Sequence, residues 1–332
     1  MMKSVTVKTM NTHRLQPGNE VRVIAPSDGW RTRREEAYAR AKERLEGLGL
    51  IVTYGAHIKS QGRFGTGPVA DRLADLHDAY RDPNVRLIIA LHGGWSANGL
   101  LRGMDWELIK ANPKPLMGFS DITVLLNALY GRTGTVNYLG PNFSTLGSSH
   151  MQDYTFDNVR SVVMAEAPLA LERSRQWQRT RRGPLSKTRP WQVLQEGKGE
   201  GVLIGGNLGT FYLLQGTVNQ PVFDRPFILA AEDDDEPGRY SVREFDRRLE
   251  SLLQLPGARD YIRGLAIGRF QPGSRVTMPD VRAIVTKLEL PTIPVIADVD
   301  FGHTAPLLTL PIGGIASLAG QNNQATFNLL QW

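Results

Sequence analysis

Short apolar runs alternate with helical patterns along the first part of the chain. VRVIA (21–25), RLIIALHGG (86–94) and PLMGFS (115–120) are largely apolar runs of strand length, whereas residues 33–48 repeat apolar positions at helical spacing. Apolar strands that alternate with amphipathic helices are typical of a parallel sheet covered by helices. The pattern therefore predicts an α/β domain with a largely parallel sheet over residues 1–150.

Residues 151–199 interrupt this alternation. Two tryptophans, Trp177 and Trp191, stand there among arginines and prolines, which predicts a connector that crosses to another domain. The chain has a formal net charge of +6, and much of its excess of basic residues lies in this connector, at Arg173, Arg175, Arg179, Arg181, Arg182, Lys187 and Arg189. Such a run is either a solvated loop or a lip that attracts an anionic substrate or a nucleic acid. Because no nucleic-acid-binding motif accompanies it, we expect no nucleic-acid partner.

The remaining part of the chain, residues 200–332, is richer in strand patterns. FILAA (227–231), GLAIG (264–268) and PVIAD (294–298) are strand candidates, and LLTLPIGGIASLAG (307–320) predicts a β-hairpin. A helical pattern covers residues 242–253. We expect a smaller, mixed and β-rich C-terminal domain here.

Composition narrows the chemistry that the chain can perform. Its 332 residues, 41% of them hydrophobic, are enough for two domains with a buried core. Cysteine is absent, which excludes disulfides, a cysteine nucleophile and thiolate metal sites. The N-terminus has no apolar signal region and no apolar stretch reaches 18 residues, so we expect a soluble, cytoplasmic protein without a membrane partner.

Ser120 lies where an apolar strand runs into a helical pattern. A strand-to-helix turn lifts a hydroxyl off the sheet edge and directs free backbone N–H groups to the same point, as a nucleophile requires. The alternative is an ordinary helix cap, because Ser followed by the acidic Asp121 is common there. Ile122 replaces the second glycine of a G-x-S-x-G motif, so the segment does not favour an α/β-hydrolase.

Six blocks of the chain, in this order, resemble the LD-carboxypeptidase family of serine peptidases. They are VRVIAPS (21–27), LHGGWSANGLL (91–101), MGFSDITVLLNALY (117–130), GGNLGTF (205–211), LAAEDDDEPGRYSVREFDRRL (229–249) and DFGHTAPLLTLPIG (300–313). The resemblance implies an active site in the groove between the two domains. It also implies a catalytic triad in which Ser120 attacks, His303 takes the proton and Glu232 orients the histidine.

The residues themselves agree with these roles. Of the six histidines, only His303 follows a strand candidate within a glycine-containing turn, where an imidazole base can be held rigidly. His92 is the rival, although a lone histidine at a strand end is usually structural. Glu232 directly follows an apolar run and should be the most buried carboxylate of the acidic run 232–236.

The acidic run has a second interpretation as a solvated or metal-binding loop. No histidine lies near it in the sequence, and its aspartates are contiguous instead of alternating, which does not favour a metal site. We therefore expect no metal and no cofactor. The oxyanion hole is expected to comprise the backbone N–H of Asp121 and one from the Gly93-Gly94 turn, which we assign to Gly94.

The resemblance includes two branches with different substrates. Cell-wall enzymes release terminal D-alanine from tetrapeptides, and their motif GGYGA-x-R carries an arginine suited to the substrate carboxylate, where this chain has Gly99. The GGWSANGLL segment is more similar to the GG-x-N-S-N motif of microcin-C-immunity peptidases, although Ser96 and Ala97 depart from it. We expect hydrolysis of an amide bond in a microcin-C-like peptidyl- or aminoacyl-nucleotide conjugate, with the cell-wall tetrapeptide as the alternative substrate.

Four residues are expected to contact the substrate: Trp95, Asn98, Trp177 and Trp191. For the two connector tryptophans, packing of the connector against the body is an equal alternative to stacking on a base. The resemblance also implies a homodimer. A non-catalytic nucleotide- or peptide-binding module would tolerate the loss of a triad residue, whereas all three are present.

Overall fold

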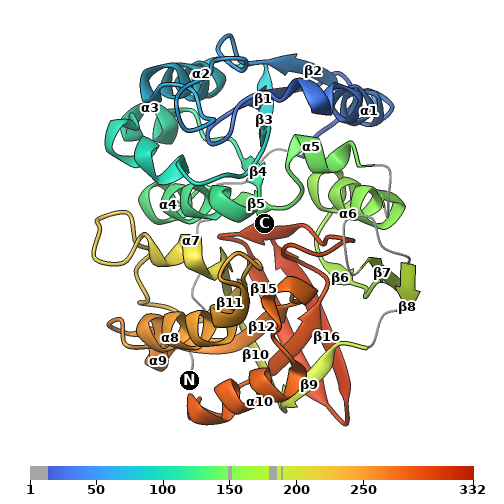
Figure 1. The fold of residues 1–332 in the computed structure, drawn as a ribbon, viewed down its shortest axis with the longest axis vertical. Coiled ribbons are helices and arrows are strands. Elements are labelled where there is room, and N and C mark those ends of the chain that lie inside the picture. Colours follow the sequence, from blue (N-terminus) through green and yellow to red (C-terminus); the bar gives the residue numbers. More distant parts are fainter. Residues whose placement is uncertain (1–13, 149–151, 179–184, 188–189) are drawn as a thin grey trace.

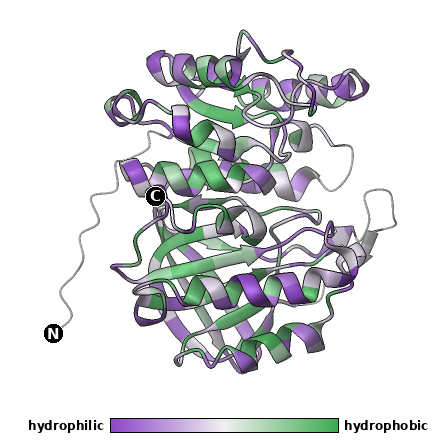
Figure 2. Cartoon of the chain, turned by 60° about the vertical axis from the view of Figure 1, so that its left-hand side comes forward, coloured by the Kyte–Doolittle hydropathy of each residue, from purple (hydrophilic) through white to green (hydrophobic). Residues whose placement is uncertain are grey.

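The computed structural model describes residues 14–148, 152–178, 185–187 and 190–332. Two β-sheets form the two halves of the molecule, and helices cover them (Figure 1). Hydrophobic residues concentrate on the strands, whereas hydrophilic residues concentrate on the outward sides of the helices (Figure 2). In the described ranges, no helix is both long and apolar enough to cross a bilayer.

The first sheet is parallel except at one edge. Its strands, in spatial order, are β14 (Leu310–Ile312), β5 (Asn137–Leu139), β4 (Leu116–Gly118), β3 (Val85–Ala90), β1 (Glu20–Ile24) and β2 (Ile51–Tyr54). Only β14 runs antiparallel to its neighbour. The helices of this half are α1 (Glu35–Glu46), α2 (Val69–Arg81), α3 (Trp106–Ala111), α4 (Thr123–Thr133), α5 (Phe143–Leu146) and α6 (Gln152–Met164). The predicted α/β fold with a largely parallel sheet is confirmed.

The second sheet is mixed, as predicted. A parallel core is formed by β10 (Gly197–Asn207), β11 (Phe227–Glu232), β12 (Ile262–Gly268) and β13 (Val295–Val299). Antiparallel strands flank this core, namely β15 (Ile315–Gln321), β16 (Gln324–Gln331), β6 (Leu169–Leu171) and β9 (Gln192–Gln195). The helices of this half are α7 (Leu208–Tyr212), α8 (Ser241–Leu253), α9 (Ala258–Tyr261) and α10 (Met278–Lys287).

The connector contributes strands to the second sheet. β6 and β9 lie at its two edges, and β7 (Gln176–Gln178) and β8 (Leu185–Lys187) pair as a separate two-stranded sheet. Four of the predicted basic cluster, namely Arg179, Arg181, Arg182 and Arg189, lie outside the described residues. Arg173, Arg175 and Lys187 are exposed.

The hairpin predicted over residues 307–320 is wrong. β14 pairs with β5 of the first sheet, and the hairpin is formed one strand later by β15 and β16. Asn322 and Asn323 at its tip both have positive φ, which asparagine tolerates well in tight turns. The glycines that suggested the turn instead carry the chain from one sheet to the other, with Gly313 N–H bonded to Leu203 O and Leu203 N–H to Gly314 O.

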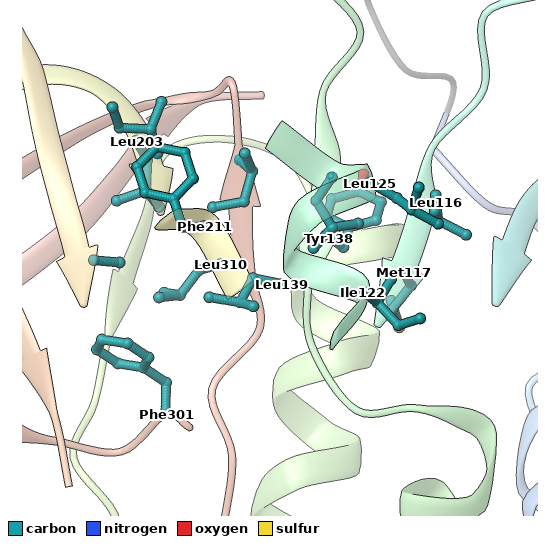
Figure 3. Packing of buried hydrophobic residues seen from close by; sticks show 14 of the residues in the cluster. Leu116, Met117, Ile122, Leu125, Tyr138, Leu139, Leu203, Phe211, Phe301 and Leu310 are labelled. Carbon is teal, nitrogen blue, oxygen red and sulfur yellow. The ribbon is translucent and has the colours of Figure 1, made fainter. Parts of the chain in front are cut away.

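Helix α4 joins the two halves. Asn127 exchanges two hydrogen bonds with the backbone of Gly205 on β10, and the Thr123 hydroxyl accepts from the backbone N–H of Asn207. Apolar side chains fill the surrounding space, including Leu139 and Leu310 from the first sheet and Phe211 from α7 (Figure 3). The start of α4 is thereby fixed against the carboxyl end of β10.

Candidate active site

The structure brings Ser120, His303 and Glu232 together from three separate segments. Ser120 follows β4, Glu232 is the last residue of β11, and His303 lies in the loop after β13. His303 Nε2 is 2.9 Å from Ser120 Oγ, and His303 Nδ1 is 2.8 Å from Glu232 Oε2. A carboxylate can only accept, so Nδ1 carries a proton toward Glu232 and Nε2 of the neutral ring faces the hydroxyl.

Ser120 adopts a sharp backbone conformation. Its φ is 65°, in the left-handed region that side chains other than glycine and asparagine rarely occupy. A short 3-10 turn, Ser120–Ile122, leads from it into α4, and the serine side chain caps neither element. Gly118 permits the sharp turn, because a Cβ there would lie 2.8 Å from Asn142 Oδ1 and 2.9 Å from Ile122 Cγ2. The hydroxyl is thus directed to His303 instead of the helix start.

Glu232 is buried against glycines of neighbouring segments. Only 1% of its surface is exposed. A Cβ on Gly302 would lie 2.6 Å from Glu232 Oε2, and one on Gly268 would lie 2.7 Å from Glu232 Cβ, so both glycines permit the close approach. Asp233, its neighbour, forms an ion pair with Arg248. Among the described residues of the acidic run, only Glu232 is hydrogen-bonded to His303.

The surroundings of His303 change its proton affinity. Burial lowers the pKa of His303, but the charge of Glu232 and its hydrogen bond outweigh burial, and Asp234 and Asp233 add to them, so that the pKa rises to about 9. The Phe119 ring also lies beside the imidazole, with ring centroids 5.2 Å apart. The site therefore stabilises the imidazolium that a general base becomes once it has taken a proton.

His92, the rival base, is hydrogen-bonded to Tyr38 and not to Ser120 in the described part of the chain. Its Nε2 is 2.6 Å from the hydroxyl of Tyr38. Burial and, to a smaller extent, the positive charges of Arg31, Arg34 and Arg33 together lower the pKa of His92 to about 3. This histidine is a neutral, buried packing residue.

The glycine pair lies directly beside Ser120. A Cβ on Gly93 would lie 2.9 Å from Ser120 Cβ and 3.1 Å from its Oγ. Gly94 has a φ of 153°, and a Cβ there would collide with the carboxylate of Asp28 and the hydroxyl of Ser27. Within the described part of the chain, the Gly94 N–H donates no hydrogen bond to a protein acceptor. Glycine is therefore required at both positions, and the Gly94 amide is available to a ligand.

Two charged side chains that no sequence pattern singled out bind the residues that follow this turn. The carboxylate of Asp121 accepts from the backbone N–H groups of Ser96 and Ala97, and the guanidinium of Arg72 donates to the carbonyl oxygen of Ser96. The sequence predicts a role only for the backbone N–H of Asp121, because an acidic residue at a helix start is ordinary. Its burial distinguishes it from such a residue.

A cavity of about 600 Å³ opens beside the turn. Trp95, Ser96, Asp28, Arg72 and the loop over residues 62–69 line it. Trp95 is 74% exposed, an unusual exposure for a tryptophan, and so presents its ring to this space. Asn98 is exposed on the following 3-10 helix, Ala97–Gly103, but does not line the cavity.

Both connector tryptophans adjoin the buried Arg269–Asp300 ion pair, and the Arg269 guanidinium lies 5.1 Å from the centroid of the Trp177 ring. Trp177 is partly buried on β7, the next residue, Gln178, donates its backbone N–H to Ala305 O at 2.8 Å, and Ala305 is two positions beyond His303. Trp191 is 5% exposed and donates its indole N–H to Asp300. These placements favour packing for Trp191 and leave Trp177 beside the His303 loop.

Known proteins are similar to this chain over most of its length. The sequence profile of the LD-carboxypeptidase N-terminal domain matches residues 21–140, and that of the C-terminal domain matches residues 200–318. The putative carboxypeptidase YocD of Bacillus subtilis is 40% identical, with 92% of this chain and 94% of the relative covered. The murein tetrapeptide carboxypeptidase of Pseudomonas aeruginosa is 31% identical, with 94% of each chain covered.

Solved structures share the whole fold. The crystal structure of an MccF-like protein from Bacillus anthracis superposes with a TM-score of 0.92 at 36% identity, covering 96% of this chain and 98% of the other. MccF in complex with glutamyl sulfamoyl guanosine has a TM-score of 0.85 at 23% identity, covering 97% and 98%, and shows the shared fold. Both domain profiles and near-complete relatives agree, and the chain accordingly belongs to the LD-carboxypeptidase family of serine peptidases.

Proposed function

We propose that the protein hydrolyses an amide bond with Ser120 as nucleophile, His303 as general base and Glu232 as the carboxylate that orients the base. The observation that carries the proposal is the continuous hydrogen-bonded chain from Ser120 Oγ through both ring nitrogens of His303 to Glu232. The same arrangement of hydroxyl, imidazole and carboxylate performs acyl transfer on unrelated folds.

The reaction proceeds in two proton-balanced halves. Ser120 Oγ attacks the carbonyl carbon as its proton passes to His303 Nε2, and the oxyanion accepts hydrogen bonds from the backbone N–H groups of Gly94 and Asp121. The carbon–nitrogen bond then breaks while His303 returns the proton to the leaving nitrogen. Water, deprotonated by His303, attacks the resulting ester and releases the acid and the free Ser120 hydroxyl.

The proposed substrate is an aminoacyl or peptidyl group joined to a nucleotide-like group. Gly99 is exposed with open space around it, so this position offers no side chain for the terminal carboxylate of a tetrapeptide. The Trp177 ring, on which Arg269 already stacks, lies next to the His303 loop, and we propose that a purine stacks on its other face for about 1–3 kcal/mol. MccF, which shares the fold, has been solved with glutamyl sulfamoyl guanosine.

Release of D-alanine from cell-wall tetrapeptides is the second candidate. It is favoured by the relative from Pseudomonas aeruginosa, which is named a murein tetrapeptide carboxypeptidase. A comparison of kcat/KM for a muropeptide tetrapeptide and an aminoacyl-sulfamoyl adenosine separates the two, with Ser120→Ala as the control. We expect the adenosine compound to be cleaved at least about tenfold faster, since one good stacking contact supplies that factor. Preference for the tetrapeptide would assign the protein to cell-wall chemistry.

We also propose a homodimer, as the family resemblance implies, and a cytoplasmic location, with a nucleophile domain up to residue 150, a connector over 151–199 and a C-terminal domain from residue 200. Light scattering of the purified protein tests the oligomeric state directly. A monomer across the working concentration range would contradict that part of the proposal.

A further inference from the structure

The Ser96–Ala97 peptide, which follows the Gly93-Gly94 turn after Trp95, lies between two buried charges. The carbonyl oxygen of Ser96 accepts from Arg72 Nη1 at 3.0 Å, and the N–H of Ala97, which belongs to the same peptide, donates to Asp121 Oδ2 at 2.8 Å. The N–H of Ser96 donates to the same carboxylate oxygen at 2.8 Å. The peptide dipole is therefore aligned with its oxygen toward the cation and its hydrogen toward the anion.

These charges are almost fully removed from water. Asp121 is 3% exposed and Arg72 is 6% exposed, and within the described ranges neither forms a direct ion pair with another side chain. A buried charge costs free energy unless hydrogen bonds compensate it. Here the compensation runs through the Ser96–Ala97 peptide, and hydrogen bonds in such a chain strengthen one another. Rotating that peptide would turn its oxygen toward the carboxylate, so both charges favour a single conformation of the turn.

Both side chains also form hydrogen bonds with the segment that follows β1. The Ser27 hydroxyl donates to Asp121 Oδ2 at 2.5 Å, and Arg72 Nη1 donates to the carbonyl oxygen of Pro26 at 2.9 Å. Arg72 comes from α2, whereas Asp121 directly follows Ser120 in the chain. The carboxylate of Asp121, the residue next to Ser120, thus connects the backbone of Ser96 and Ala97 to the proposed nucleophile.

We propose that Asp121 and Arg72 are positioning residues that fix the Gly94 amide relative to Ser120, so that it meets the oxyanion as the oxyanion forms. The inference rests on the proposed function, in which Gly94 supplies an oxyanion-hole donor. Such a donor contributes only where it is held in place before the reaction, and loss of one costs about 10²–10³ in kcat. Asp121 and Arg72 should therefore stabilise the transition state more than the bound substrate, because the carbonyl oxygen gains its negative charge only as Ser120 attacks.

The central test is Asp121→Asn, which keeps the backbone N–H and nearly the shape of the side chain but removes the charge. We expect kcat for aminoacyl-sulfamoyl adenosine to fall about 10- to 100-fold, a part of what a whole donor supplies, with KM changed less than about threefold. In a Ser120→Ala background, the Kd for the same compound should not change when Asp121→Asn is added. Unchanged kcat, or an equal loss in Kd, would overturn the proposal.

A matched control separates positioning from plain stability. Asp75 is a buried carboxylate on α2 that accepts from the backbone and ring of His57 and, among the described residues, from neither Ser96 nor Ala97. Asp75→Asn should lower the melting temperature while leaving kcat near wild type. If Asp75→Asn and Asp121→Asn lowered kcat equally, the role of Asp121 would be structural only.

Arg72→Gln provides a second route if Asp121→Asn does not fold. It removes the other charge, and we expect the same fall in kcat at constant KM. Because both residues act through one peptide, the kcat of the double variant should lie within about threefold of that of the slower single variant. Multiplying losses would contradict a shared peptide. A wild type that hydrolyses no faster than Ser120→Ala would instead refute the proposed function itself, whatever the turn variants do.

Discussion

His303 Nε2 lies 2.9 Å from Ser120 Oγ, although the two residues are 183 positions apart in the chain. Ser120 is positioned by a strand of the first sheet, and Glu232 behind the histidine is positioned by a strand of the second. This hydrogen-bonded pair is therefore assembled by the packing of the two sheets on each other, and each of its members can be tested separately.

Replacement of the nucleophile gives the first prediction. Ser120→Ala should lower kcat by about 10³- to 10⁴-fold or more, because the other groups of the triad cannot form the ester. The fold should be retained, because the left-handed backbone at position 120 costs alanine at most about 1 kcal/mol more free energy than it costs serine. Steady-state kinetics and circular dichroism check both parts. Retention of more than about a tenth of wild-type activity would remove Ser120 from the mechanism.

A pair of isosteric variants distinguishes the carboxylates of the acidic run. Glu232→Gln should lower kcat by about 10³- to 10⁴-fold, because the amide cannot accept from Nδ1–H in the same way or stabilise the imidazolium. Glu236→Gln, at an exposed position, should change kcat less than about threefold. Comparable losses in the two variants would show that Glu232 has no special role.

The pH dependence follows from the raised pKa of His303. The base must be neutral to take the proton of Ser120, and Glu232 helps to raise its pKa to about 9, so kcat/KM should still increase between pH 7 and pH 9. The sign for stability is opposite. A raised histidine pKa stabilises the fold fully below the unfolded value near 6.5, and this contribution is lost as the pH rises through about 9. An activity that levels off well below pH 7 would contradict the assignment.

The connector tryptophans should respond in different ways. Trp177→Ala should raise KM for aminoacyl-sulfamoyl adenosine by about 5- to 100-fold, if a purine stacks there, and leave kcat for a small ester unchanged. Trp191→Phe removes the hydrogen bond to buried Asp300 and should lower the free energy of unfolding by about 1–3 kcal/mol without altering KM. If Trp177→Ala lowered the free energy of unfolding but left KM unaltered, Trp177 too would have only a structural role.

Local patterns were sufficient to predict much of the first sheet and the position of Ser120. The apolar run before Ser120 and the helical spacing after it describe a strand-to-helix turn without knowledge of any distant contact. The hydrogen bonds of Arg72 and Asp121 to the backbone of Ser96 could not be predicted in this way, because they join three separate segments of the chain. The predicted hairpin over 307–320 failed for a related reason, since glycines mark a change of direction but not the sheet that the next strand enters.

The strand exchange at the C-terminal end limits how the protein can be divided. β13 belongs to the second sheet and β14 to the first, so the loop that carries His303 is fastened at both ends to different halves of the molecule. A fragment that stopped near residue 150 would leave the fully buried strand β5 as a bare edge, open to pairing with other chains. It would also carry the serine without its base. The first sheet is therefore complete only with a strand from the C-terminal part of the chain, and activity from separately produced fragments would require that they reassemble across β5 and β14.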